Sequence, residues 1–275
     1  MLSRFWYNQP IVCGAILLIS VLGMLAAGGL WYQAKTAEQL FKQRQLHYSP
    51  VLFAAQQFPL GDFVVDWNTT QGGGLSVIDP KHNRVLWQHQ PGLGFVTLKA
   101  IPDMLQENQL PVTAQACQQQ LIYGFARRQK KLQVMGKVFC PNGQYYDYSL
   151  VFRAINQQQV DLNLKFESAD VIALTLKTAI EGNEKIIGYT QDEAPTKAHS
   201  EAMKIASDSP KHTLPYWLST KNRGMVLKAK LQGAFDLKEA QQIVASGPGR
   251  ELYLHTFRAS SKEKLWQYLQ PLHQR

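Results

Sequence analysis

Apolar and polar residues alternate with a period of two along most of the chain after residue 61. Runs such as RVLWQ (84–88), FVTLKA (95–100) and LQVMGKVFC (132–140) are short and rich in β-branched and aromatic residues. This pattern predicts strands with one buried face. Turn residues, including Pro91-Gly92 and Pro141-Asn142-Gly143, separate the runs. Many short strands without intervening helices predict a mainly β protein, an antiparallel β-sandwich over residues 61–259.

The alternation also predicts which aromatic rings are buried. Tyr146 and Tyr148 share one face of a predicted strand, while Tyr145 and Asp147 share the other, so only one of these faces can belong to the core. Trp87 is expected to be a core ring, and Pro91-Gly92 the turn that leads to the next strand.

The first sixty residues follow a different pattern. Residues 11–32, IVCGAILLISVLGMLAAGGLWY, carry no charge and exceed the ~20 residues that a membrane-spanning helix needs. Trp6 precedes the segment and Trp31 closes it, as expected at the two membrane interfaces. The segment lacks a good signal-peptidase site, so we expect an uncleaved anchor. Residues 1–10 form its flank, and residues 33–60 are predicted to be a juxtamembrane helix and a linker.

Two later segments interrupt the strand pattern. A polar stretch over residues 190–211 is expected to hold a short helix from His199 to Ala206. At the end of the chain, Ser260 is followed three residues later by Glu263, a capping-box signature that predicts a helix over 260–275.

The net charge of the chain limits which kinds of binding partner we expect. The 275 residues carry a net charge of +9 and a pI near 9.4, which permits an anionic partner such as lipid headgroups or nucleic acid. The densest basic cluster, residues 127–131, lies between two predicted strands and is expected to be a solvated hairpin end. We therefore expect a membrane partner and no nucleic acid.

Two cysteines, Cys117 and Cys140, lie in the predicted sandwich. They can pair in a disulfide if the sandwich faces the periplasm; otherwise they are buried thiols.

Candidate catalytic and metal-binding residues are sparse. The aspartates occur singly on predicted strands and turns, and nothing in the sequence pairs two of them as a glycosidase requires. His82 and His89 are seven residues apart without further ligands, so we expect neither a metal site nor a cofactor. Aromatic residues remain candidates for stacking on sugars, against the expectation that strand aromatics fill the core. These candidates are Trp67, Trp87, Tyr145, Tyr146, Tyr148, Tyr216 and Trp217.

The order of motifs resembles glycoside hydrolase family 31, in its α-glucosidase and sulfoquinovosidase-like branch. DFVVDWNTTQGGGLSVIDPKHNRVLWQHQPGLGFVTL (62–98) resembles the opening of the family's N-terminal, galactose-mutarotase-like β-sandwich. GNEKIIGYTQD (182–192) resembles the strand leading into the family's G-x-G-E-Q segment, which makes Gln191 and Asp192 the nearest matches to substrate-binding residues. The segments LPYWLSTKNRGMVLKAKLQGAFDL (214–237) and ELYLHTFRASSKEKLWQYLQPLHQR (251–275) continue the series in order.

This resemblance implies a non-catalytic domain. The family's two catalytic aspartates belong to a barrel that follows the sandwich, and neither aspartate motif occurs in this sequence. We therefore expect a membrane-anchored N-terminal domain, or a truncated product, of a family-31 α-glycosidase, without catalytic residues and inactive alone. An alternative is a carbohydrate-binding module or one that docks a separately encoded barrel, and a third is an envelope assembly protein. The expected location is the bacterial inner membrane, with a single span and the sandwich in the periplasm.

Overall fold

The computed structural model describes residues 23–24, 28–29, 31, 45–49, 54–101, 114–189, 204–206, 215–228, 233–236, 241–258, 264 and 267. The chain divides into two compact units, Met1–Arg44 and Gln45–Arg275. In the first unit the five described residues are helical, and the rest of the predicted span at 11–32 lies outside the described residues. Within the described ranges, no helix has both the length and the apolar character needed to cross a membrane.

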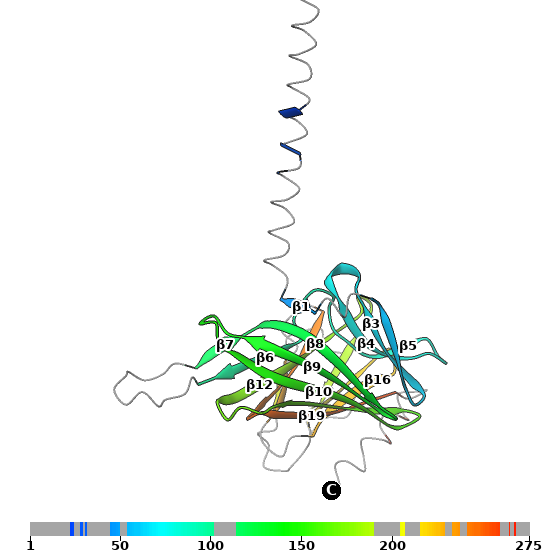
Figure 1. The fold of residues 1–275 in the computed structure, drawn as a ribbon. Coiled ribbons are helices and arrows are strands. Elements are labelled where there is room, and N and C mark those ends of the chain that lie inside the picture. The colour runs from blue at the N-terminus through cyan, green and yellow to red at the C-terminus, as the bar shows by residue number, and fades with distance from the viewer. Residues whose placement is uncertain are drawn as a thin grey trace, which may run out of the picture. The chain divides into compact units, whose positions relative to one another are not determined.

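The described strands of the second unit form three β-sheets (Figure 1). The nine-stranded sheet runs in the order β1 (Leu46–Tyr48), β8 (Gln119–Arg128), β9 (Lys131–Phe139), β10 (Tyr145–Asn156), β11 (Gln159–Phe166), β19 (Glu251–Arg258), β16 (Arg223–Leu227), β15 (Tyr216–Ser219) and β13 (Ile186–Tyr189). The six-stranded sheet runs in the order β14 (Lys204–Ala206), β17 (Ala234–Asp236), β18 (Gln242–Pro248), β12 (Val171–Ala179), β6 (Val96–Ala100) and β7 (Gln115–Cys117). The four-stranded sheet runs in the order β2 (Gln56–Leu60), β3 (Phe63–Asn68), β4 (Gly74–Asp79) and β5 (Arg84–Gln88), and a short 3-10 helix, Thr70–Gly72, connects β3 to β4.

The prediction of a mainly β, antiparallel fold is confirmed. Every strand pairing among the described residues is antiparallel except that of β1 with β8. The predicted alternation on β10 also holds, because Tyr146 and Tyr148 are buried whereas Tyr145 and Asp147 are exposed. The basic residues 127–131 lie at the exposed β8–β9 hairpin end, as expected.

All three sheets contribute side chains to one hydrophobic core. Trp87 is fully buried, and its ring lies 5.7 Å from that of Phe95 and 5.5 Å from that of Phe152. The turn after β5 places Gly92 at a φ of 76°, a conformation that favours glycine. The prediction that Trp87 is a core ring followed by a Pro91-Gly92 turn is therefore confirmed.

The sheets begin earlier than the sequence pattern predicted. Strands β1 and β2 both lie within residues 33–60, which the sequence analysis assigned to a helix and linker. The pairing of β1 with β8 joins segments more than 70 residues apart, so no local pattern indicates it. Strand β2 contains Pro59, which cannot donate a ladder hydrogen bond and is tolerated because β2 is an edge strand.

The prediction of a helix from His199 to Ala206 is wrong for its last three residues. Residues Lys204–Ala206 form β14, which pairs with β17, and the earlier part of that helix lies outside the described residues. Of the helix predicted over 260–275, only Lys264 and Gln267 are described, and both are helical.

A buried ion pair connects the three sheets. The guanidinium of Arg223 on β16 donates two hydrogen bonds to the carboxylate of Glu184, from Nε at 2.6 Å and from Nη2 at 2.5 Å. It also donates to the carbonyl oxygens of Ala179 at the end of β12 (3.0 Å) and of Leu86 on β5 (3.4 Å). Burial alone would raise the pKa of Glu184, but the hydrogen bond and positive charge of Arg223 hold it below its usual range.

His89 is a buried, neutral histidine. Its Nε2 accepts a hydrogen bond from the backbone N–H of Leu75 at 2.8 Å, and its Nδ1–H donates to the carbonyl of Gln90 at 2.9 Å. Burial lowers the pKa of His89 to about 4. Both ring nitrogens are used within the fold, so His89 has a structural role.

The buried state of His89 predicts a loss of stability in acid. Because the folded-state pKa is about 4 and the ordinary value is 6.5, the unfolded chain gains a proton first as the pH falls through this window. We expect this group alone to lower the free energy of unfolding by about 2 kcal/mol between pH 7 and pH 4.5. Urea denaturation at the two pH values measures the loss in the wild type and in His89→Gln, which cannot titrate. An equal loss in both proteins would contradict this role.

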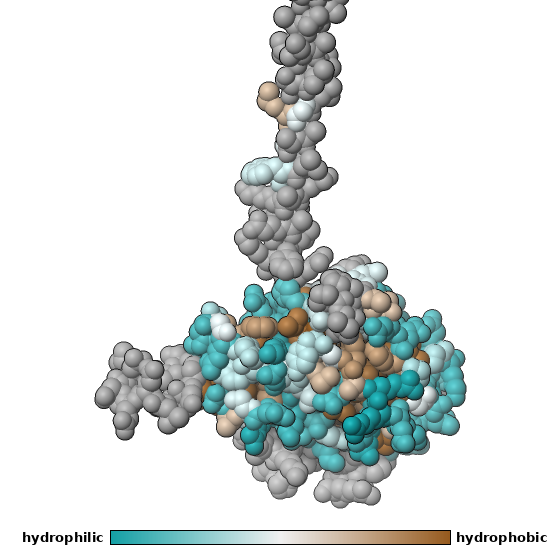
Figure 2. All heavy atoms as spheres, in the orientation of Figure 1, coloured by the Kyte–Doolittle hydropathy of each residue, from teal (hydrophilic) through white to brown (hydrophobic). Residues whose placement is uncertain are grey.

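The surface carries few large apolar side chains. Among the described residues of the second unit, the exposed ones are Tyr123, Tyr145, Ile155 and Ile172. Hydrophilic residues cover most of the face of the second unit drawn in Figure 2, with hydrophobic residues visible between them.

Candidate functional site

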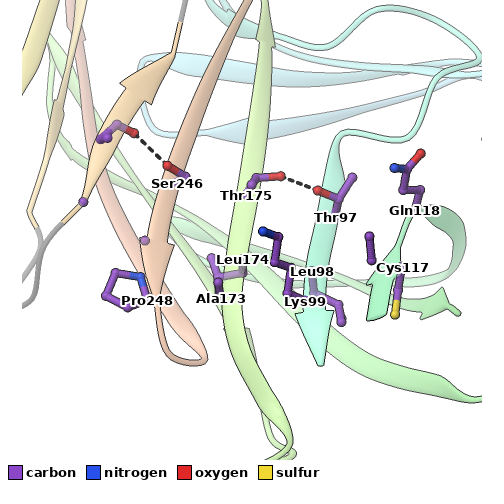
Figure 3. Close-up of a pocket in the computed structure, with 14 residues that line it drawn as sticks. Thr97, Leu98, Lys99, Cys117, Gln118, Ala173, Leu174, Thr175, Ser246 and Pro248 are labelled. Carbon is purple, nitrogen blue, oxygen red and sulfur yellow. Dashed lines mark hydrogen bonds between the residues drawn. The ribbon is translucent and has the colours of Figure 1, made fainter. Parts of the chain in front are cut away.

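A groove of about 620 Å³ lies on the outer face of the six-stranded sheet (Figure 3). Its floor comes from β6, β12 and β18, and its ends from β7 and the residues around β17. The inward-facing side chains of these strands, such as Leu98 and Leu174, belong to the hydrophobic core. The outward-facing positions are therefore the ones available to a ligand.

Strand register aligns the lining residues in two rows. In the first row, Thr97 on β6 pairs with Thr175 on β12, Thr175 pairs with Ser246 on β18, and Ser246 pairs with Ala234 on β17. Neighbouring strands are ~4.8 Å apart, so this row extends about 14 Å across the sheet. The second row consists of Ala116, Lys99, Ala173 and Pro248 on β7, β6, β12 and β18.

Small side chains make the groove hollow. The lining includes alanine, glycine and proline residues beside the longer side chains of Lys99 and Gln118, so little side-chain volume fills the groove. Gly233 cannot be enlarged cheaply, because a Cβ there would lie 2.3 Å from the side chain of Leu227.

Hydroxyl and amide groups give the groove its chemistry. The hydroxyls of Thr97 and Thr175 hydrogen-bond each other, and Ser246 Oγ donates to the carbonyl of Ala234 at 3.4 Å. A hydroxyl has one donor and two acceptor sites, so each group retains capacity for a further partner. Gln118 adds an amide and Lys99 an exposed ammonium group. The arrangement suits a ligand with many hydroxyl groups.

The described lining residues include no aspartate, glutamate or histidine. Glycoside hydrolysis uses two carboxylates on opposite sides of the scissile bond. The described lining of the groove therefore holds no pair of carboxylates of the kind that this reaction uses. Across the described residues, no group of three metal-ligating side chains occurs either.

Asp161 is the centre of a polar side-chain cluster outside the groove. Its carboxylate accepts hydrogen bonds from His255 Nδ1 (2.6 Å), the Tyr253 hydroxyl (2.7 Å) and Gln159 Nε2 (2.9 Å). Burial acts to raise the pKa of Asp161, but these donors lower it overall. Burial and the hydrogen bond to Asp161 raise the pKa of Tyr253 to about 12. Because the donors occupy both carboxylate oxygens, this cluster joins β11 to β19 and leaves no free base.

A disulfide joins Cys117 and Cys140. From the sequence, both a disulfide and two buried thiols were possible for these residues. Cys117 ends β7, the edge strand that forms one wall of the groove, while Cys140 follows β9 of the nine-stranded sheet. The bond therefore attaches that wall to the neighbouring sheet.

The remaining candidates are the residues predicted to bind substrate or to stack on sugars, and those that the structure describes do not line the groove. Gln191 and Asp192 lie outside the described residues. Of the aromatic side chains considered for sugar stacking, Tyr145 is 49% exposed, and the other six belong to the buried core or are otherwise buried. Lys137 Nζ lies 3.8 Å from the centre of the Tyr145 ring, so this cation covers one face of it. Of the aromatic residues that the sequence put forward and the structure describes, Tyr145 therefore has the exposed ring.

No sequence motif marks Thr97, Thr175 or Ser246 as a binding residue. Each occupies an ordinary outward position on a predicted strand, and the only local signal is its small polar side chain. The register that aligns them joins segments as far apart as residues 97 and 246, which the sequence alone does not give.

Comparison with known proteins gives structural likenesses only. No protein-family model matches the chain, and no curated protein sequence matches it. Solved structures similar to it include a family-31 sulfoquinovosidase from E. rectale, with 8% identity, a TM-score of 0.47, and coverage of 78% of this chain and 33% of that one. A family-31 dextranase from Flavobacterium johnsoniae gives 9% identity, a TM-score of 0.31, and coverage of 78% and 27%.

A 4-alpha-glucanotransferase from Thermococcus litoralis gives 7% identity, a TM-score of 0.32, and coverage of 74% and 37%. At these TM-scores the likenesses carry no argument about what this chain does. The chain spans about a third of the length of the solved proteins it is similar to.

Proposed function

We propose that the chain is a membrane-anchored, non-catalytic β-sandwich that binds carbohydrate in the groove of its six-stranded sheet. The observation that carries the proposal is the lining of the groove, whose described residues offer aligned hydroxyls on three strands and an amide but no carboxylate pair. Sugars expose many hydroxyls that both donate and accept hydrogen bonds, so such a lining is complementary to them.

The proposal extends to a relationship with family-31 glycoside hydrolases. Its support is the series of motifs from Asp62 to Arg275, which resembles the galactose-mutarotase-like N-terminal domain of that family in its α-glucosidase and sulfoquinovosidase-like branch. In that relationship the sandwich contributes binding, and the hydrolytic carboxylates belong to a different domain.

The proposed location is the bacterial inner membrane, with the sandwich in the periplasm. The uncharged segment 11–32 supports the anchor, and the Cys117–Cys140 disulfide supports an oxidising compartment for the sandwich. A dual topology reporter fused after Arg275 tests this assignment. Periplasmic reporter activity is expected, and cytoplasmic activity alone would reject it.

Titration of the full-length chain in detergent with linear α-glucan oligosaccharides tests the binding function. We expect measurable binding and at least a tenfold loss of affinity in Thr175→Trp, because the indole would fill the groove beside Thr97 and Ser246. Ser149→Trp is the matched control, since Ser149 is also a half-buried, outward-facing strand residue but lies on β10.

Two results would count against the proposed function. Equal affinity of the Thr175→Trp and Ser149→Trp proteins would exclude the groove as the binding site, provided that thermal unfolding shows both variants to be folded. Measurable turnover of an α-glycoside by the purified chain would contradict its non-catalytic character.

A further inference from the structure

A second, smaller pocket of about 290 Å³ lies where the four-stranded sheet meets the end of the six-stranded sheet. Polar side chains from β3, β4, β5 and the turn after β5 line one side of it, namely Asp66, Asn68, Ser76, Gln88 and Gln90. The described lining residues include no lysine or arginine. One carboxylate, several amides and a hydroxyl are groups that hydrogen-bond an uncharged, hydroxylated ligand.

Gln242 holds one lining residue of this pocket in place. Its side chain is buried, with 7% of the residue exposed, and its Nε2 donates to the Oε1 of the lining residue Gln90 at 2.7 Å. Gln242 also pairs in register with Ala179, another lining residue. These contacts join the turn after β5 to β18 and β12, so the four-stranded and six-stranded sheets are connected beside the pocket.

Strand β12 connects the pocket to the groove. Thr175 lines the groove and Ala179 lines the pocket, and residues an even number apart on a strand face the same side. The four-residue separation corresponds to about 13 Å along the strand. Lys177 lies between the two positions on the same face and is half-buried. On the neighbouring strand β18, Ser246 and Gln242 pair in register with Thr175 and Ala179.

We infer that the groove and the pocket form one continuous track that binds a linear oligosaccharide, with a terminal sugar in the pocket. This inference rests on the proposed function and specifies its ligand class. A single sugar occupies only one end of the track, whereas a chain longer than the separation of Thr175 and Ala179 reaches both. Linking two contacts in one ligand raises the overall affinity above that of either contact, because the second association becomes intramolecular.

Binding of the full-length chain in detergent is measured by titration with a series of linear α-glucan oligosaccharides, from a single glucose to seven units. In the wild type we expect affinity to rise at least tenfold between the shortest and longest members. In Gln88→Ala and Asp66→Ala the affinity for long members falls towards that for short ones, because the contact in the pocket is lost and only the groove contributes. Gln119→Ala and Asp147→Ala are matched controls, because both residues are exposed on the nine-stranded sheet, and they keep the wild-type dependence on length.

The outcomes separate this inference from the function on which it rests. Binding that is independent of chain length, or a length dependence that survives in both Gln88→Ala and Asp66→Ala, would overturn the continuous track while leaving the groove as a binding site. Failure of every member of the series to bind the wild type would overturn the carbohydrate-binding function itself. Thermal unfolding confirms that each variant is folded, and either pocket variant suffices if the other does not fold.

Discussion

Replacement of Arg223 by alanine is expected to lower the free energy of unfolding by about 3–5 kcal/mol, because it leaves the buried carboxylate of Glu184 without its partner. Arg223 is 2% exposed and Glu184 is 8% exposed. The substitution also removes the donors that reach the carbonyl oxygens of Leu86 and Ala179. The cost arises mainly from the uncompensated charge and not from the lost attraction alone.

Urea denaturation at pH 7, followed by circular dichroism, measures the effect. Lys81→Ala provides the control, since Lys81 pairs with Asp62 on the surface, where the lysine side chain is 62% exposed. That variant is expected to lose less than about 1 kcal/mol. The double variant Arg223→Met/Glu184→Leu should recover much of the loss, because it removes both charges. A loss below 1 kcal/mol in Arg223→Ala would show that Glu184 finds other compensation.

The second large effect concerns the Cys117–Cys140 disulfide. The double variant Cys117→Ser/Cys140→Ser is expected to lose about 2–4 kcal/mol, since the bond restricts the unfolded chain. The two cysteines are 23 residues apart in sequence. Because Cys117 ends the edge strand that walls the groove, we also expect weaker α-glucan binding in this variant.

Reduction of the wild type gives the matched comparison. Dithiothreitol should lower the denaturation midpoint of the wild type to that of the double variant and leave the variant unchanged. A free-thiol assay on the unfolded wild type without reductant should find neither of these two thiols. Insensitivity of the wild-type midpoint to reductant would contradict a stabilising bond.

The sequence predicted what depends on local alternation. The inward and outward faces of β10 followed from the positions of Tyr145 to Tyr148, and the buried position of Trp87 followed from its strand. It did not predict β1, because a three-residue strand in parallel pairing with β8 has no local signal. The sequence pattern predicted a helix where Lys204–Ala206 form β14. The extended conformation of these residues accompanies their pairing with β17, which has no local signal in the sequence.

The candidate site was harder to predict than the fold. Thr97 and Thr175 are 78 residues apart in sequence, and their contact follows from the register of β6 on β12. Gln88 and Ala179 come from different sheets, so only the packing of those sheets brings the second pocket together. A sequence pattern that identifies exposed strand positions does not indicate which of them become neighbours.

The contacts of Arg223 have a consequence for how this chain can be divided. The four-stranded sheet is continuous in sequence, from Gln56 to Gln88, and resembles a separable N-terminal piece. Yet Leu86 within it accepts a hydrogen bond from Arg223, a residue 137 positions later. A fragment that starts after β5 would leave that buried guanidinium short of an acceptor and expose the core face around Trp87. The three sheets therefore constitute one indivisible unit for expression, and a shortened version of the sandwich has to retain them all.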